Sequence, residues 1–344
     1  MKLFITTDLH YCERNSIVHR MGHTYTTRLE NCIKTQNWTE QEAERLNCDA
    51  IVHLGDFFDR PSLTDQEITA CKEIEWSKLP HYFLVGNHES GDINLQYSST
   101  KILEDKNRQV ISAPMKIDLP ECEICFIPYI SECERRPINE YFGEKTDKPR
   151  IVLSHNDIKG IQMGPVISRL GFDTEEIEQS CDLFLNGHLH NGTVLSNIII
   201  NLGNITGKDF GEDATRYEHR AAIIDTNEFT LSFVENPHAF NFYSKIDIMN
   251  RDQFDFLDTL KPNAVLSVKC LDELIPELRE RIDALPNILE YRIIAFRPVI
   301  EDNAENKEVI THSSLDHLAL FAEFCRTHLE NDDVLEFELG EVCK

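Results

Sequence analysis

The chain has 344 residues, of which 41% are hydrophobic and 27% charged, as in an ordinary soluble globular protein. Its formal net charge of −26 argues against a broad electrostatic grip on nucleic acid, although it leaves room for a local basic patch. No apolar run approaches the ~20 residues of a membrane-spanning helix, and we expect the 11 scattered cysteines to be reduced thiols of a cytoplasmic protein.

The predicted elements begin with strands that alternate with helices. The opening stretch, MKLFITTDLH, predicts a first strand rather than a signal peptide. Two more β-rich apolar runs follow at 50–55 and 81–86, and the polar segments 25–46 and 64–79 that separate the three runs have helical length. In the second of these segments Ile68, Cys71 and Ile74 recur at helical spacing, which predicts a helix there.

Closely spaced strands dominate the next part of the chain. Their apolar runs lie at 123–129, 150–155, 182–187, 197–203, 221–225 and 229–234. Early alternation of strands and helices followed by such runs predicts an α/β protein with one large sheet or a sheet sandwich.

The pattern changes around 235–245, and there we place the boundary between a core domain, 1–240, and a smaller domain, 241–344. The smaller domain reads as strand 264–270, helix 271–285, strand 288–296 and helix 313–329. Its acidic end suits protein docking or a solvated surface rather than DNA binding. One face of the last helix either packs on its own domain or docks a partner; it consists of Leu315, Leu318, Phe321, Phe324 and Cys325.

Side chains with metal-binding chemistry follow five of the predicted strands. They are Asp8 and His10, Asp56 and Asp59, Asn87 and His88, His155, and His188 and His190. Turn chemistry alone does not account for five apolar runs that each end in Asp, His or Asn. Carboxylates mixed with imidazoles suit manganese, iron or zinc better than calcium. The set is too large for one metal with an open position and suits two metals that share a carboxylate.

These motifs resemble those of a known family. Asp8-x-His10, GDFFD (55–59), GNHE (86–89), His155 and GHLH (187–190) are similar to the motifs of the calcineurin-like metallophosphoesterases. The segment NLGNITGKDFGE (201–212) resembles one in the double-strand-break repair nucleases, among them the SbcD-type subunit of bacteria and phages. The resemblance implies a four-layer α-β-β-α core and a small C-terminal α/β capping domain. It also implies a hydrolase that acts as a DNA exonuclease in DNA repair and recombination, with endonuclease activity as a second expected reaction.

The resemblance also implies roles for individual residues. One metal ion would be held by Asp8, His10, Asp56 and His190, and the other by Asp56, Asn87, His155 and His188. His88 would be the general acid, with Asp59 orienting it by a carboxylate–imidazole pairing. We expect two divalent ions, most readily manganese, with magnesium, iron or zinc as alternatives.

Two other functions remain open at this point. GDFFDR and GNHES also resemble the phosphoprotein phosphatases, although Pro61 stands where that pattern has glycine. Two divalent metals, two carboxylates and a bridging hydroxide sum to about +1, which a diester monoanion neutralises, whereas a monoester dianion wants additional arginines. The third possibility is a DNA-end-binding scaffold subunit without activity, which the complete ligand set disfavours.

Candidate substrate-binding cations are Arg60, which follows a motif, and Arg14 and Arg20 in the locally basic stretch 13–28. A second basic stretch, 133–150, includes Arg135 and Arg136. A solvated face is the simpler interpretation of both stretches. The resemblance implies DNA, a homodimer partner and an SbcC-like coiled-coil ATPase as partners. It implies no membrane and a cytoplasmic location, the host cytoplasm if the chain is phage-encoded.

Overall fold

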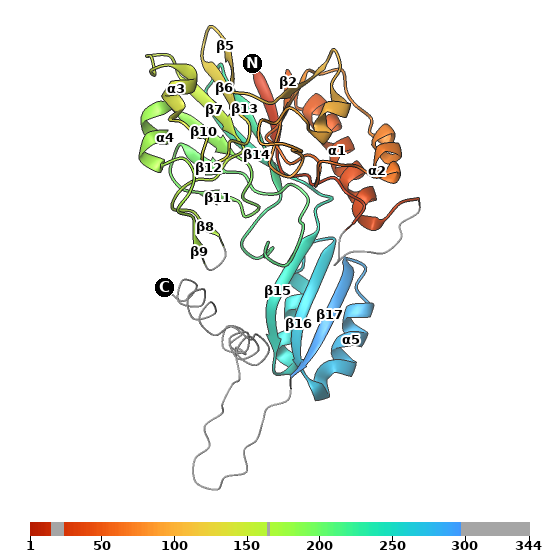
Figure 1. Cartoon of the computed structure of the whole chain (residues 1–344). Coiled ribbons are helices and arrows are strands. Elements are labelled where there is room, and N and C mark those ends of the chain that lie inside the picture. Colours follow the sequence, from red (N-terminus) through yellow and green to blue (C-terminus); the bar gives the residue numbers. More distant parts are fainter. Residues whose placement is uncertain (15–23, 164–165, 297–344) are drawn as a thin grey trace, which may run out of the picture. The chain divides into compact units, whose positions relative to one another are not determined.

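Two six-stranded sheets form the centre of the part of the chain that the computed structural model describes, residues 1–14, 24–163 and 166–296 (Figure 1). The first sheet has the order β14 (Thr230–Glu235), β13 (Arg220–Asp225), β1 (Lys2–Thr6), β2 (Ala50–His53), β3 (His81–Leu84), β4 (Arg108–Ile111). The second has the order β11 (Thr193–Val194), β12 (Ile199–Asn201), β10 (Leu183–Asn186), β7 (Arg150–Ser154), β6 (Glu123–Ile127), β5 (Met115–Asp118).

The middle strands of each sheet are parallel. β1 to β4 run parallel in the first sheet, as do β6, β7, β10 and β12 in the second, and the outer strands β13, β14, β5 and β11 are antiparallel additions. Parallel strands place their carboxyl ends at one edge of a sheet. The loops that follow these strands therefore gather at that edge.

Side chains alternate between the two faces of each sheet, and both faces are apolar. Leu3 and Ile5 of β1 point into a core shared by the two sheets, whereas Phe4 points into an outer core with Leu29 of α1 (Thr27–Arg45). A corresponding outer core covers the second sheet, where α3 (Ile138–Phe142) and α4 (Thr174–Ser180) pack. Such burial on both faces produces four layers, which confirms the predicted α-β-β-α sandwich.

The boundaries of the first two helices agree with the sequence prediction to different degrees. Thr26 caps α1 by accepting a hydrogen bond from the Leu29 amide, close to the predicted start. The predicted helix 64–79 is shorter: α2 (Asp65–Ala70) begins with a capping box and continues only as the 3-10 helix η1 (Cys71–Glu73). Ile68 is 43% exposed, so its helical spacing with the buried Cys71 and Ile74 does not mark a single apolar face.

The predicted strand–helix–strand pattern of the C-terminal part is present. β16 (Ala264–Leu271), α5 (Ile275–Asp283) and β17 (Ile288–Phe296) form it, and β15 (Asn241–Ile248) completes a three-stranded sheet. One compact unit extends from Met1 to Ile294. The domain boundary after residue 240 stays a prediction, and the predicted helix 313–329 lies outside the described residues.

The remaining described elements are short. They are the strands β8 (Gln162–Met163) and β9 (Val166–Ile167) and the 3-10 helices η2 (Ser99–Leu103), η3 (Arg251–Thr259) and η4 (Asp272–Leu274). The cysteines of the described residues are free, and all but Cys133 are buried. Across those same residues, no helix combines the length and the apolarity that crossing a membrane requires.

A buried polar cluster lies in the outer core of the first sheet. The Nε2 atom of His81 is 2.9 Å from the Glu40 carboxylate. Beside them, His53 shares a hydrogen bond of 2.9 Å between its Nδ1 atom and the Thr6 hydroxyl, and its ring stacks on Phe83 with centroids 4.3 Å apart. Burial, together with His81, lowers the pKa of His53 to about 3.

This cluster predicts a pH-dependent stability. The unfolded chain protonates His53 near its ordinary pKa of about 6.5, whereas the folded chain does not until about pH 3, so acidification between these values favours unfolding. Between pH 7 and pH 5 His53 should lower the free energy of unfolding by about 2 kcal/mol. Urea unfolding in EDTA at both pH values should therefore show a loss that is about 2 kcal/mol smaller in His53→Leu than in the wild type.

The control is Thr6→Val, which removes the hydrogen bond but no titrating group. It should lower stability by a similar amount at both pH values. An undiminished pH dependence in His53→Leu would mean that another group titrates.

Candidate metal centre

The loops after five parallel strands bring the predicted ligands together. Side chains from β1, β2, β3, β7 and β10 meet in three groups, in each of which the candidate ligand atoms lie within 4.8 Å of one another. The groups are Asp8, His10 and His190; Asp56, His155 and His188; and His10, Asp56 and His88. Asn87 joins the second group, since its Oδ1 atom is 2.9 Å from Nδ1 of His188.

The backbone turns sharply where these residues follow their strands. Asp8, His10, Asp56 and His188 have φ angles of 51°, 47°, 49° and 76°, in the left-handed region that residues other than glycine seldom adopt. Gly86 permits the close approach, because a Cβ atom there would lie 2.1 Å from Oδ1 of Asp56. The loop geometry therefore depends on these local conformations.

The two buried carboxylates are each held by one oxygen only. Oδ2 of Asp8 accepts hydrogen bonds from the Thr7 hydroxyl at 2.6 Å and the His188 amide at 3.0 Å. Oδ1 of Asp56 accepts one from the His88 amide at 3.0 Å. The other oxygens, Oδ1 of Asp8 and Oδ2 of Asp56, are buried without a hydrogen-bond partner.

Three of the imidazoles are fixed by a second carboxylate. The pairs are His10 Nδ1 with Asp59 at 3.0 Å, His188 Nε2 with Asp157 at 3.2 Å, and His190 Nδ1 with Glu212 at 2.9 Å. Metal-binding histidines usually donate their outer N–H to such a carboxylate, which sets the tautomer and the ring orientation. In each pair the opposite nitrogen is left for the interior of the site.

The inward nitrogens face other candidate ligand atoms of the site. Nε2 of His10 and Nε2 of His190 face each other at 2.9 Å. Neither ring nitrogen of the buried His155 has a hydrogen-bond partner, although Nε2 lies 3.2 Å from Oδ2 of Asp56. Leaving such groups unpaired costs on the order of 1–3 kcal/mol each. The donor set therefore fits divalent cations.

The protonation of His10 and Asp56 agrees with metal binding, whereas burial of His155 and His190 is outweighed by Asp56 and Glu212, which raise the pKa of these two imidazoles. Burial lowers the pKa of His10 to about 4, with the hydrogen bond to Asp59 opposing it, so the imidazole is in the neutral form that a metal binds. Burial raises the pKa of Asp56, but His155 and His10 outweigh it, and the net pKa lies well below the ordinary value. Both groups are thus in their ligand forms at neutral pH.

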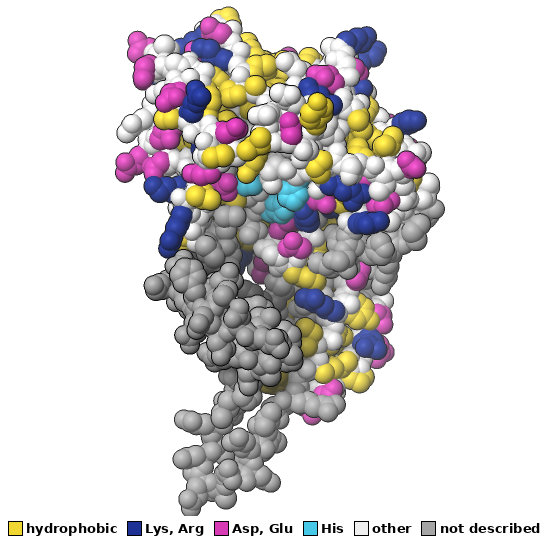
Figure 2. All heavy atoms as spheres, in the orientation of Figure 1, with side chains coloured by type: hydrophobic (Ala, Val, Ile, Leu, Met, Phe, Trp, Pro, Cys, Tyr) yellow, Lys and Arg dark blue, Asp and Glu magenta, His cyan; other side chains and the backbone are white. Residues whose placement is uncertain are grey.

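His88 lies beside the carboxylates and reaches the solvent. Its side chain is 39% exposed, and Figure 2 shows histidine side chains at the surface of one face of the molecule. Nδ1 of His88 donates a hydrogen bond of 3.2 Å to the Asp59 backbone carbonyl and lies 3.9 Å from the Asp59 carboxylate, the partner expected from the sequence. The Asp59 carboxylate instead contacts His10 and accepts a hydrogen bond of 2.8 Å from Lys208.

Of the candidate substrate-binding arginines, the two that the structure describes pair with carboxylates outside the ligand set. Arg60 donates to the buried Glu67 at 2.7 Å, which holds its guanidinium on α2. Arg14 is 76% exposed and pairs only loosely with Glu13, at 3.6 Å. Arg20 lies outside the described residues.

Several supporting residues were not predicted from the sequence. Asp157 follows the predicted ligand His155 by two residues, and Glu212 and Lys208 lie in the segment 201–212 whose family resemblance was noted without a role for them. Arg28 is fully buried and donates to the backbone carbonyls of Leu9, at 2.9 Å, and Gly207, at 3.0 Å. Its position on α1 gave no signal, because a helical arginine is usually solvated.

Comparison with known proteins identifies the family. The model of the calcineurin-like phosphoesterases matches residues 1–218, and this family uses a dimetal centre. A dimetal phosphatase from Danio rerio is 14% identical, with 65% of this chain and 91% of that one covered at a TM-score of 0.42. A purple acid phosphatase from yellow lupin seeds is 14% identical, with 69% and 51% covered at 0.43. A calcineurin-like phosphoesterase from Bacillus subtilis is 11% identical, with 68% and 88% covered at 0.34. No curated protein matches.

The first prediction for the site separates ligands from the proton donor. Asp56→Asn should lose bound metal and activity together, because Asp56 belongs to two of the ligand groups. His88→Asn should keep both metal equivalents and lower kcat by about 100- to 10,000-fold, the usual contribution of a general acid. Metal analysis after gel filtration, with the exposed Asp147→Asn as control, measures both. Loss of one metal equivalent in His88→Asn would make His88 a ligand.

The second prediction concerns the carboxylate behind His190. Glu212→Gln keeps the side-chain size but weakens the charge-assisted hydrogen bond at 2.9 Å. It should lower the affinity for the more weakly held manganese ion by about 10- to 100-fold. Isothermal titration of metal-free protein measures this, with the exposed Glu218→Gln as the control. Equal affinity in wild type and Glu212→Gln would contradict the role of this pair.

Proposed function

The chain belongs to the calcineurin-like phosphoesterase family, and we propose that it is a metal-dependent phosphodiesterase that cleaves DNA, with manganese as its working metal. The observation that carries the proposal is the complete set of seven donor side chains around two buried carboxylates. The set is Asp8, His10, Asp56, Asn87, His155, His188 and His190. When bound, two divalent ions would stabilise the charge that develops on the phosphoryl oxygens.

The residues of the chain position the reacting groups. Asp8, His10, Asp56 and His190 would hold one ion, and Asp56, Asn87, His155 and His188 the other. The carboxylates behind the imidazoles keep their rings in place, so little reorganisation is needed when substrate arrives. The partners Asp59, Asp157 and Glu212 thus act on geometry rather than on substrate.

His88 is the proposed proton donor to the departing sugar oxygen. Donation from Nδ1 to the Asp59 carbonyl, at 3.2 Å, leaves Nε2 as the position from which a proton can be delivered. The ring is partly exposed and packs edge-on to His10, with centroids 4.8 Å apart. It therefore lies between the metal ligands and the solvent, where a leaving group would exit.

A diester is favoured over a phosphate monoester by the cations around the site. A dianionic monoester gains from additional arginines, but Arg60 is bound to Glu67, Lys208 donates to Asp59, and Arg28 to backbone carbonyls. The protein phosphatase alternative would need an arginine with a donor turned to the metals. Arg135 lies 3.9 Å from Asp157, behind His188, but its guanidinium is already held by Glu132 and by the Ile130 carbonyl.

DNA as the substrate and an SbcD-type role rest on the motifs. The Phe-Gly-Glu motif of the segment 201–212 supplies Glu212, which fixes His190 of GHLH, so both motifs of the nuclease resemblance belong to one site. We propose an SbcD-type nuclease subunit of bacterial or phage type, active in the cytoplasm as a homodimer with a coiled-coil ATPase. The helix proposed to dock that ATPase lies outside the described residues. A partner with a basic surface would offset the net charge of −26.

The substrate prediction is a preference for diesters. With manganese, the protein should cleave bis-(p-nitrophenyl) phosphate and linear duplex DNA, with a kcat/KM at least about tenfold above that for p-nitrophenyl phosphate or a phosphopeptide, or roughly 1.4 kcal/mol of transition-state discrimination. Steady-state kinetics with His88→Asn as the inactive control measures this. A higher kcat/KM for the phosphopeptide would place the protein among the phosphatases.

A further inference from the structure

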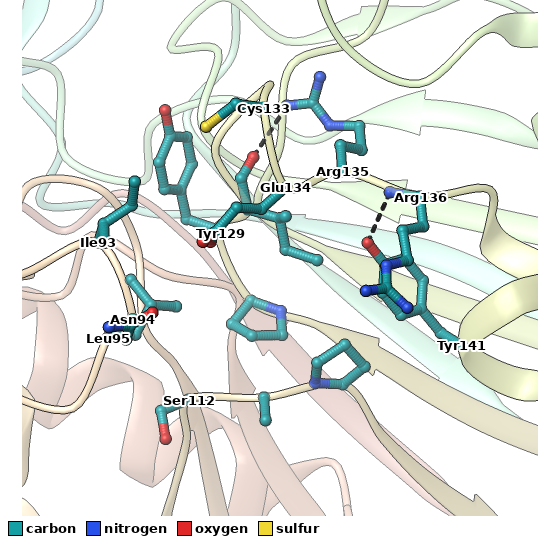
Figure 3. Close-up of a pocket in the computed structure, with 14 residues that line it drawn as sticks. Ile93, Asn94, Leu95, Ser112, Tyr129, Cys133, Glu134, Arg135, Arg136 and Tyr141 are labelled. Atoms are coloured by element: carbon teal, nitrogen blue, oxygen red, sulfur yellow. Dashed lines mark hydrogen bonds between the residues drawn. The ribbon is translucent and has the colours of Figure 1, made fainter.

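A cavity of about 510 Å³ lies at the same edge of the sheets as the candidate metal centre. Its walls come from 93–95, after β3, from 112–114, after β4, from 128–136, after β6, and from Tyr141 of α3 (Figure 3). β3, β4, β6 and β7 are parallel neighbours in their sheets, so these loops adjoin those that carry Asn87 and His155. The size falls in the range of about 300–1,000 Å³ typical of small-molecule sites.

The lining combines aromatic and apolar surface with cations. Tyr129 and Tyr141 supply rings, Ile93 supplies an apolar side chain that is 57% exposed, and Arg135 and Arg136 supply guanidinium groups. Figure 3 shows the two tyrosines and the two arginines around one hollow. A π-face beside a cation is the combination that binds a nucleobase and its phosphate, because bases stack on aromatic rings without regard to sequence.

One side of the cavity touches the metal ligands. The ring of Tyr129 lies 5.7 Å from the ring of His188, centroid to centroid. Arg135 lies 3.9 Å from Asp157, the carboxylate that holds Nε2 of His188. A group in the cavity is therefore separated from the metal centre by a single side chain.

The two arginines differ in how they are held. The Arg135 side chain is only 7% exposed, pairs with Glu132 and donates to the Ile130 carbonyl at 3.0 Å, so it is part of the wall. Its Nε atom is buried and has no hydrogen-bond partner. Arg136 is exposed, and its guanidinium forms no ion pair with another described residue. Its backbone amide donates to the Tyr141 hydroxyl at 2.8 Å, which anchors the main chain at Arg136 to that side chain.

We propose that this cavity receives one nucleoside unit of the DNA strand, adjacent to the phosphate that is cleaved at the metal centre. The base lies against Tyr129 and Tyr141, with Ile93 at the rim, and Arg136 binds the phosphate on the far side of that nucleoside. Glu134 also lines the cavity and repels phosphate, so the phosphate takes the Arg136 side. The inference rests on the proposed nuclease function and adds the subsite that positions the strand.

Two variants test the subsite without touching the metal ligands. Arg136→Ala removes the cation, and Ile93→Glu places a like charge where the strand would enter; both positions are exposed. Each should raise KM for manganese-dependent cleavage of a short oligonucleotide by about tenfold, within the range for loss of one stacked or paired nucleotide contact. kcat/KM for bis-(p-nitrophenyl) phosphate should stay within about twofold. Arg279→Ala, an exposed arginine on α5, is the matched control.

A binding measurement keeps this test separate from that of the proposed function. Calorimetry with thymidine monophosphate in EDTA needs neither metals nor cleavage. The nucleotide should bind equally to the wild type and to Arg279→Ala, and about tenfold more weakly to both test variants; this result supports the subsite. If the wild type bound the nucleotide in this way but did not cleave DNA, only the nuclease proposal would be rejected. No binding to wild type at millimolar nucleotide, or equal binding to both variants, overturns the subsite.

Discussion

The structure depends on the burial of two half-satisfied carboxylates at the edge of its sheets. Asp8 and Asp56 each use one oxygen to accept backbone amides, from His188 and His88, and turn the other, unpartnered, to the interior. The Asp8–His188 bond joins a loop of the first sheet to a loop of the second, whereas the Asp56–His88 bond joins two neighbouring loops of the first sheet. Burying these negative charges is costly, and among the side chains around them the imidazoles of His155 and His10, at 3.2 and 3.8 Å, offset part of that cost. The fold therefore provides a place for cations before any are bound.

The same demand explains the strained backbone. Asp8, His10, Asp56 and His188 adopt left-handed φ angles, which cost on the order of 1 kcal/mol each for residues with a Cβ atom. The apolar layers on both faces of each sheet compensate, because they fix the strands from which these turns start. The strands β1, β2 and β10 thus stabilise the fold. The conformations of the loops after them are those that direct the candidate metal ligands into the site.

The features that could be predicted from the sequence are those that the strands themselves determine, rather than those that contacts between loops determine. Strand ends with Asp, His or Asn gave the metal-ligand candidates, because a buried parallel strand is an apolar run and its last residues are read directly. Asp157 and Glu212 act through imidazoles distant in the chain. The predicted helix 64–79 stops at Glu73, and the chain after it bonds to α1 instead, through the Glu75 amide to Asn37 and the Ser77 hydroxyl to Glu40. Tertiary contacts therefore decided both features. The sequence predicts a solvated surface position for Arg136. Its place in the wall of a cavity could not be predicted, because loops that follow three different strands form that cavity.

The distribution of cations around the site bears on how so acidic a chain could hold a polyanion. Lys208, Arg60 and Arg135 are each paired with a carboxylate, namely Asp59, Glu67 and Glu132. Such pairs contribute little to long-range attraction, because their fields cancel beyond the screening length of about 8–10 Å. Attraction for a phosphodiester strand in this region would then come from the bound metal ions and from Arg136. Specificity would be set by contact within a few ångströms of the metals rather than by a basic surface, so longer tracts of DNA would have to be held by another protein surface.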